Sequence, residues 1–296
     1  IGECALNVVF EQGVPVGSLP GGRIAAAAAL MAGDKCPVVM ASEASADPVG
    51  DMVLDPLVKA GVDISSVDRF TEGHTPVMLF TESVDGTSQV TRYEDYADQA
   101  FDVVWPGVDK GSVVIFGGYY AIDRRMRTRM LPFLNHCAER GATLIYLPGF
   151  MARQQPRITR VMPSILENLE LAHLVVARDI DLALIFGTPA GDICYADHID
   201  FYCRSLINID TACRHLNYFS GKQLTQIEIP ERICETMTWN AGVLAGIAAE
   251  IFTGDITPAQ LDAPDDDLRR QLLAAAVASA NAAAAKLTLQ WQHKIR

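Results

Sequence analysis

The stretch W-N-A-G-V-L-A-G-I-A-A-E-I-F, residues 239–252, is apolar over nearly its whole length and ends before Thr253 and Gly254. A helix that is apolar all round is typical of a protein interior, and its small residues allow tight packing against a sheet. Thr236 and Thr238 stand where an N-cap belongs. Because the first N–H groups of a helix are unpaired and its dipole favours negative charge, the start of this helix is a candidate anion site.

On both sides of this helix, short apolar runs alternate with helical segments. Strands are expected at 1–10, 37–41, 113–116, 143–147, 174–177 and 206–209. Helices are expected at 23–32, 51–60, 126–140, 163–168, 179–185 and 265–286. This alternation predicts an α/β fold with a central, mostly parallel sheet and helices on both faces.

Two alternating runs do not fit the parallel sheet. Residues 75–83 and 87–93 flank Asp85 and Gly86, which is a strong hairpin signal. Residues 13–15 are expected to form a turn after the first strand. The hairpin and the N-terminal loop together predict a small side sheet.

Composition limits the possible functions. The chain has 296 residues, half of them hydrophobic, which suits one domain over 1–296. A net charge of −12 without a basic patch argues against nucleic acid or an anionic membrane as partner. No apolar run approaches the roughly 18 residues of a membrane span, and no signal peptide is recognised. The seven scattered cysteines form no C-x-x-C pair, so reduced thiols and a cytoplasmic location are expected.

Several short motifs occur in an order that resembles one known family. They are G-E-x-x-x-N at 2–7, P-G-G at 20–22, D-x-x-G at 47–50 and F-G-G-x-x-A at 116–121. The chain resembles the ribokinase-like (phosphofructokinase B-type) carbohydrate kinases, and most closely their fructokinase-like branch. This resemblance implies a ribokinase-like fold with a small β lid, formed near 8–20 and 72–98. It also implies phosphoryl transfer from ATP, with Mg²⁺, to a sugar hydroxyl.

The resemblance assigns the sugar-binding residues. Asn7 stands where the family has an Asp that holds sugar hydroxyls, and Asn can still donate and accept hydrogen bonds. Gly21 and Gly22 are kept, whereas the Asn expected just after them is Ala25. In the lid segment, a Lys and an Arg of the branch are lost, and Arg92 is either their substitute or a solvated lid residue.

The chain departs most from the family's pattern at the catalytic motif. Its D-T-x-G-A-G-D reads E-T-M-T-W-N-A at 235–241, so Ala241 stands where the family has its general base. Thr238, Trp239 and Asn240 occupy the anion hole, where both glycines are gone. Alanine has no titratable atom, and loss of a general base typically costs about 10²–10⁴-fold in rate.

The nucleotide and metal motifs are altered as well. The family's D-P-N-x-R reads L-P-G-F-M at 147–151, and the turn within 207–215 has no glycine, which makes ATP contact doubtful. Asp181 lies in the segment linked to the metal. It either polarises a water on Mg²⁺ or compensates a helix dipole.

Two hypotheses follow. The first is an ATP-dependent sugar kinase whose activity is weak or lost. The second is a catalytically inactive kinase-fold protein, a pseudokinase that serves binding or assembly. A homodimer through the lid is expected in either case, because an exposed apolar lid face would be costly in a monomer.

Overall fold

The computed structural model describes residues 1–33, 36–82, 88–95, 101–152, 154–229 and 237–288. Within these residues the larger sheet has six strands in the order β12-β11-β10-β9-β8-β7. They are β7 Val113–Gly117, β8 Thr143–Leu147, β9 Leu174–Arg178, β10 Ser205–Asp210, β11 His215–Ser220 and β12 Gln223–Glu228. Strands β7 to β10 run parallel, while β11 and β12 are antiparallel. The predicted central, mostly parallel sheet is confirmed.

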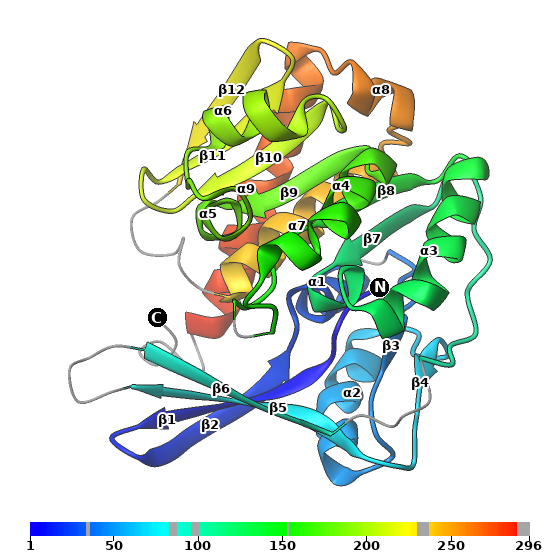
Figure 1. Cartoon of the computed structure of the whole chain (residues 1–296), viewed down its shortest axis with the longest axis vertical. Coiled ribbons are helices and arrows are strands. Elements are labelled where there is room, and N and C mark those ends of the chain that lie inside the picture. The colour runs from blue at the N-terminus through cyan, green and yellow to red at the C-terminus, as the bar shows by residue number, and fades with distance from the viewer. Residues whose placement is uncertain (34–35, 83–87, 96–100, 153, 230–236, 289–296) are drawn as a thin grey trace.

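Helices cover both faces of this sheet (Figure 1). One face carries α1 Arg23–Gly33, α7 Met237–Thr253 and α9 Asp266–Thr288, and the other carries α3 Arg124–Glu139, α4 Met162–Leu171 and α5 Asp179–Phe186. Strand β8 shows why both faces are buried. Ile145 and Leu147 pack into the core beneath α1 and α7, whereas Leu144 and Tyr146 pack into the core beneath α3 and α4. Successive side chains of a strand point to opposite faces, so each face has its own apolar core.

The apolar helix singled out in the sequence is α7, and its closest neighbour is α9 rather than the sheet. A Cβ on Gly242 would lie 2.6 Å from the Cα of Ala280, and one on Gly246 would lie 2.4 Å from the carbonyl oxygen of Ala275. The small residues of α7 therefore allow two helix backbones to approach each other directly. Helices α1, α7 and α9 lie together on this face of the sheet (Figure 1).

A second sheet forms the lid. Its strands are β1 Ala5–Glu11, β2 Val14–Gly21, β5 His74–Glu82 and β6 Ser88–Asp95, in the order β2-β1-β5-β6. The predicted β5–β6 hairpin is confirmed, while its turn at Asp85 and Gly86 lies outside the described residues. The lid extends below the larger sheet in Figure 1. Helix α2 Pro48–Ala60, which Asp47 caps and Gly61 ends, begins three residues before the expected 51–60 and packs against β1 and β5. That 1–296 forms a single domain stays a prediction.

Three local predictions were wrong, and one hairpin was not predicted. Residues 14–21 form strand β2 rather than only following a turn, and the β11–β12 hairpin was missed. Residues 37–41 form no strand and have only an isolated bridge from Val39 to Asp63. Helix α7 begins at Met237, so Thr238 lies within its first turn and is not the N-cap. Thr236 lies outside the described residues.

Candidate functional site

Strand register places two of the predicted sugar-binding residues on one face of the lid. Asn7 of β1 is in register with Met78 of β5, and Met78 is in register with Arg92 of β6. Residues in register on neighbouring strands share a face of the sheet. Asn7 is only 1% exposed, so its amide belongs to the interior beneath the lid.

The two predicted glycines connect the lid to α1 and bring it close to Asn7. A Cβ on Gly21 would lie 2.3 Å from Oδ1 of Asn7, so the backbone at Gly21 lies directly against that amide. Gly22 has a φ of +100°, and a Cβ there would lie 2.1 Å from the carbonyl oxygen of Glu3. Gly22 therefore requires glycine, because of its backbone conformation and its contact with backbone, whereas a side chain at residue 21 would displace the Asn7 amide.

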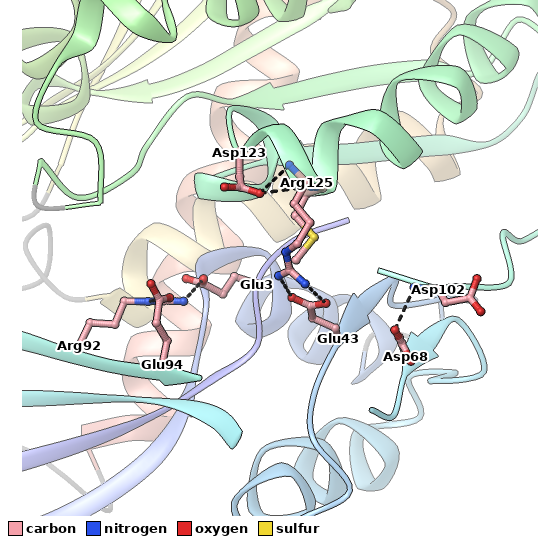
Figure 2. Close-up of polar contacts among 9 residues, drawn as sticks. Glu3, Glu43, Asp68, Arg92, Glu94, Asp102, Asp123 and Arg125 are labelled. Atoms are coloured by element: carbon pink, nitrogen blue, oxygen red, sulfur yellow. Dashed lines mark hydrogen bonds and ion pairs between the residues drawn. The ribbon is translucent and has the colours of Figure 1, made fainter. Parts of the chain in front are cut away.

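Arg92 is held by two carboxylates at the inner edge of the lid (Figure 2). Its Nη2 donates to Oε1 of Glu3 at 2.5 Å, and its Nε donates to Oε2 of Glu94 at 2.5 Å. The Arg92 side chain is 9% exposed, so it is not the solvated lid residue of the alternative interpretation. Glu3 lies beside the Gly22 backbone, and the contact therefore ties the lid to the start of α1.

Together these groups offer both donors and acceptors at the junction of the lid and α1. Sugar hydroxyls both donate and accept hydrogen bonds, as do the Asn7 amide and the Arg92–Glu3 pair. The arrangement is chemically suited to a polyhydroxylated ligand beneath the lid. It contains no nucleophile with an adjacent base.

A second ion pair lies between the lid and the larger sheet. Oε1 and Oε2 of Glu43, on the short strand β3 Ser42–Glu43, accept hydrogen bonds from Nη2 and Nη1 of Arg125 at 2.5 and 3.3 Å (Figure 2). Arg125 belongs to the first turn of α3, whose N-cap is Asp123. Glu43 is 1% exposed while Arg125 is 25% exposed. Burial raises the pKa of Glu43 to about 7, although Arg125 acts to lower it.

This raised pKa predicts a pH-dependent stability difference for Glu43→Gln. Below pH 4.5 the carboxyl is protonated in both the folded and the unfolded chain. Between pH 4.5 and about 7 the unfolded chain ionises it while the folded chain keeps it protonated, and above about pH 7 it is ionised in both. The wild type therefore loses up to about 3 kcal/mol of stability across this window, which glutamine does not lose. Urea unfolding of both proteins at pH 4.5 and pH 8 measures the difference.

The matched control is Glu167→Gln. Glu167 also pairs with an arginine, Arg127, but is 49% exposed. It reports the loss of an arginine partner without the loss of a buried charge. If the stability of the Glu43 variant relative to wild type did not rise between pH 4.5 and pH 8, burial would not be the source of the raised pKa.

At the start of α7, the position that the resemblance gives to the general base is part of the apolar core. Ala241 and Trp239 are 0% exposed and Asn240 is 8% exposed, while Thr238 is half-buried. Trp239 packs with this core, and its Nε1 donates to Oδ1 of Asn281 on α9 at 3.4 Å. Its bulk is therefore directed toward α9. The preceding residues 230–236, where the rest of the anion-hole motif falls, lie outside the described residues.

Asp181 lies at the carboxyl end of β9 between two arginines. Its Oδ2 accepts from Nη1 of Arg23 at 3.0 Å and from Nε of Arg178 at 2.9 Å, and its Oδ1 accepts from Nη2 of Arg178 at 2.7 Å. It also caps α5 by accepting from the Arg178 backbone N–H at 3.2 Å. Burial alone would raise the pKa of Asp181, but Arg23 and Arg178 outweigh it and lower that pKa to about 2.

These surroundings do not fit a magnesium ion. Mg²⁺ requires oxygen ligands in octahedral geometry and is disfavoured beside cations. Here both carboxylate oxygens of Asp181 are bonded to guanidinium groups. Across the described parts of the chain, no group of three or more His, Cys, Asp or Glu is arranged to hold a metal. A carboxylate oxygen of Asp181 would have to leave an arginine before it could bind one.

The backbone N–H groups of the glycine-free turn after β10 donate hydrogen bonds to a neighbouring carboxylate. Oδ2 of Asp179 accepts from the backbone N–H of Thr211 at 3.0 Å, from its Oγ1 at 2.6 Å and from the N–H of Ala212 at 3.3 Å. Oδ1 of Asp210 accepts from the N–H of Cys213 at 2.9 Å. Because these N–H groups are engaged, they are not available to a nucleotide phosphate.

Sequence reasoning singled out Asn7, Gly21, Gly22, Arg92 and Asp181, and missed the charged residues that surround them. The missed residues are Glu3, Arg23, Glu43, Arg125 and Arg178. One signal was available. Arg23 is the first residue of α1, where the helix dipole disfavours a cation, so its charge serves something other than the helix.

A comparison with protein families matches residues 13–199 to the pfkB family of carbohydrate kinases. No curated protein matches the chain. Among solved structures, apo fructokinase from Vibrio cholerae O395 is similar, with a TM-score of 0.78 and 15% identity over 98% of this chain and 97% of that one. Aminoimidazole riboside kinase from Salmonella enterica, complexed with aminoimidazole riboside and an ATP analogue, has a TM-score of 0.76 and 17% identity over 97% and 91%.

A third neighbour is the fructokinase with bound ATP from Xylella fastidiosa, with a TM-score of 0.76 and 15% identity over 96% of this chain and 89% of that one. The two sheets, their helices and these neighbours define the class as a ribokinase-like α/β fold. The family match covers more than half of the chain, so the chain belongs to the pfkB family of carbohydrate kinases. No helix in the described residues is long and apolar enough to cross a membrane.

Proposed function

We propose that this chain binds a sugar beneath its lid and that its phosphoryl transfer is weak or lost. The observation that carries this proposal is Ala241, which occupies the position that the resemblance gives to the general base. Ala241 has no titratable atom and is 0% exposed. Loss of the general base lowers the rate by about 10²–10⁴-fold, even in a phosphotransferase whose other catalytic and binding residues are all present.

Sugar binding is supported by the residues around the lid. Asn7 lies against Gly21, Glu3 lies beside Gly22, and Arg92 pairs with Glu3, which supports a shared set of donors and acceptors at the junction of the lid and α1. Within this proposal, Asn7 and Arg92 donate to sugar hydroxyls while Glu3 accepts from them. Fructose is the first sugar to try, because the branch that the chain resembles is fructokinase-like.

Use of ATP and Mg²⁺, which the family implies, is the part of the function that we propose is impaired. The Thr211 and Ala212 N–H groups are engaged by Asp179, and Asp181 is bonded to two arginines. Thr238, Trp239 and Asn240, the predicted anion hole, lie in the first turn of α7 with Trp239 directed into the core. These contacts support weak nucleotide binding.

Isothermal titration tests this proposal, with a panel of hexoses, pentoses and nucleosides followed by Mg-ATP. At least one sugar is expected to bind, with Mg-ATP weaker than that sugar. Asn7→Leu, which keeps the side-chain volume but removes the amide, is expected to weaken sugar binding about tenfold. A panel in which nothing but Mg-ATP binds would contradict the proposal.

An alternative role in assembly is favoured by the outer strands of the lid. Val14 of β2 and Tyr93 of β6 are 61% and 60% exposed, which suits the predicted homodimer through the lid. Sedimentation at micromolar concentration is expected to show dimers, and Tyr93→Ser is expected to weaken them. Monomers alone would remove this alternative. We also propose a cytoplasmic location, because the seven cysteines of the sequence are scattered and form no C-x-x-C pair.

A further inference from the structure

Two arginines that no sequence motif predicted converge at the carboxyl end of β9. Arg23 is the first residue of α1, and Arg178 is the last residue of β9. Asp181 bonds to both, through Nη1 of Arg23 and through Nε and Nη2 of Arg178. The carboxyl ends of the strands in an open α/β sheet are where ligands bind.

Asp181 uses only part of the hydrogen-bonding capacity of the two guanidinium groups. Within the described residues, Nε and Nη2 of Arg23 and Nη1 of Arg178 donate no hydrogen bond. The side chains are 17% and 23% exposed, so a ligand can reach them. Guanidinium groups match the planar oxygen pairs of phosphates and carboxylates, and they form the stronger, charge-assisted hydrogen bonds with them.

The charge of Arg23 is incompletely compensated. Burial lowers the pKa of the Arg23 guanidinium, although Asp181 acts to raise it, and the neighbouring Arg178 lowers it further. The other nearby carboxylate, Asp179, faces Arg178 but already accepts from Thr211 and Ala212. An additional anion would therefore be favoured beside Arg23.

The backbone at Gly149 makes room for Arg23. A Cβ on Gly149 would lie 1.4 Å from Nη2 of Arg23 and 2.7 Å from Oδ1 of Asp181. The guanidinium therefore occupies the space that a side chain at residue 149 would fill, at the position where the resemblance places the Asn of the D-P-N-x-R motif. An Asn side chain at residue 149 would collide with the Arg23 guanidinium, so the glycine at this position leaves room for Arg23.

We propose that Arg23 and Arg178 bind the anionic group, a phosphomonoester or a carboxylate, of a polyol held beneath the lid. Arg23 directly follows Gly22, and Gly21 lies against Asn7, so the sugar-binding residues and the two arginines are adjacent. This inference rests on the proposed sugar binding. It names the substrate class as a sugar phosphate or a sugar acid, which is an anionic ligand rather than a neutral sugar.

Isothermal titration of the full chain with fructose, fructose 6-phosphate, gluconate, inorganic phosphate and Mg-ATP tests it. Fructose 6-phosphate or gluconate is expected to bind at least tenfold tighter than fructose, and the tighter of the two distinguishes phosphate from carboxylate. Arg178→Gln is expected to weaken the anionic ligand about tenfold and leave fructose unchanged. Asp181→Asn releases both guanidinium groups and is expected to tighten the anionic ligand about tenfold.

The control is Arg204→Gln, which removes one positive charge from a half-exposed pair with Asp200. If Arg178→Gln does not fold, Gly149→Ala displaces the Arg23 guanidinium while keeping every charge, and it is expected to weaken binding of the anionic ligand.

Equal affinity for fructose and its phosphate in every variant would overturn the anion site but leave sugar binding in place. Arginine-dependent binding of inorganic phosphate without any sugar binding would support the anion site and sink the proposed function. Mg-ATP binding that is tighter than every sugar and is lost in Asp181→Asn would overturn the inference, because Asp181 would then serve a metal.

Discussion

Replacing Gly22 with alanine is expected to destabilise the protein by about 4 kcal/mol. The residue has a φ of +100°, and its Cβ would lie 2.1 Å from the carbonyl oxygen of Glu3. Residues in such backbone conformations cost about 1–3 kcal/mol, and forced overpacking costs a similar amount. Because the clash is with backbone, no side-chain rotation relieves it. Thermal or urea unfolding measures the loss.

Gly61→Ala separates the two causes. Gly61 has a φ of +92°, but a Cβ there would meet no atom within 4 Å. It therefore reports the cost of the backbone conformation alone, expected at about 1–2 kcal/mol. The difference between the two variants measures the contact with Glu3. If Gly22→Ala were no worse than Gly61→Ala, the junction of the lid and α1 would be looser than described.

Ala241→Asp, the substitution that restores the family's residue, is expected to destabilise the chain by about 3–5 kcal/mol at pH 7. Ala241 of α7 is 0% exposed in the apolar core, and a buried unpaired carboxylate is strongly unfavourable. The new carboxyl would have a raised pKa in the folded state. Its destabilisation therefore grows as the pH rises from 4 to 8.

Ala241→Asn is the matched control, because it adds nearly the same volume without the charge. It is expected to be less harmful than Asp at pH 8 and to show no such pH dependence. Neither variant is expected to gain sugar-dependent ADP release, because Asp181 and the turn after β10 remain unchanged. An aspartate that is tolerated at pH 8 would mean that position 241 opens onto a ligand site.

The elements that could be predicted are those with local signals. Helix α2 has its cap at Asp47 and its end at Gly61, and strands β8 and β9 are short apolar runs. Strand β2 contains Pro15 and Pro20, which argue against a strand, but it is an edge strand of the lid, where proline is tolerated. The β11–β12 hairpin had a usable signal in Gly221, which lies between two alternating runs with a φ of +56°.

The charged contacts of the site could not be predicted in the same way. Arg23 and Asp181 are 158 residues apart, and Glu43 and Arg125 are 82 apart. No periodicity links such positions, and tertiary packing alone brings them together. Motif comparison identified Asn7, Gly21 and Gly22 because they belong to the short motifs at 2–7 and 20–22. It missed Arg23, one residue further along, because the motif leaves that position undefined.

The central claim is that phosphoryl transfer is weak or lost, and ADP release at high protein concentration tests it most directly. Mg-ATP is supplied with a panel of hexoses, pentoses and nucleosides. Kinases typically turn over at roughly 1–100 per second, so a loss of about 10²–10⁴-fold predicts sugar-dependent release below about 1 per second, down to background. Sugar-dependent release above about 1 per second would contradict the account and require a base other than residue 241.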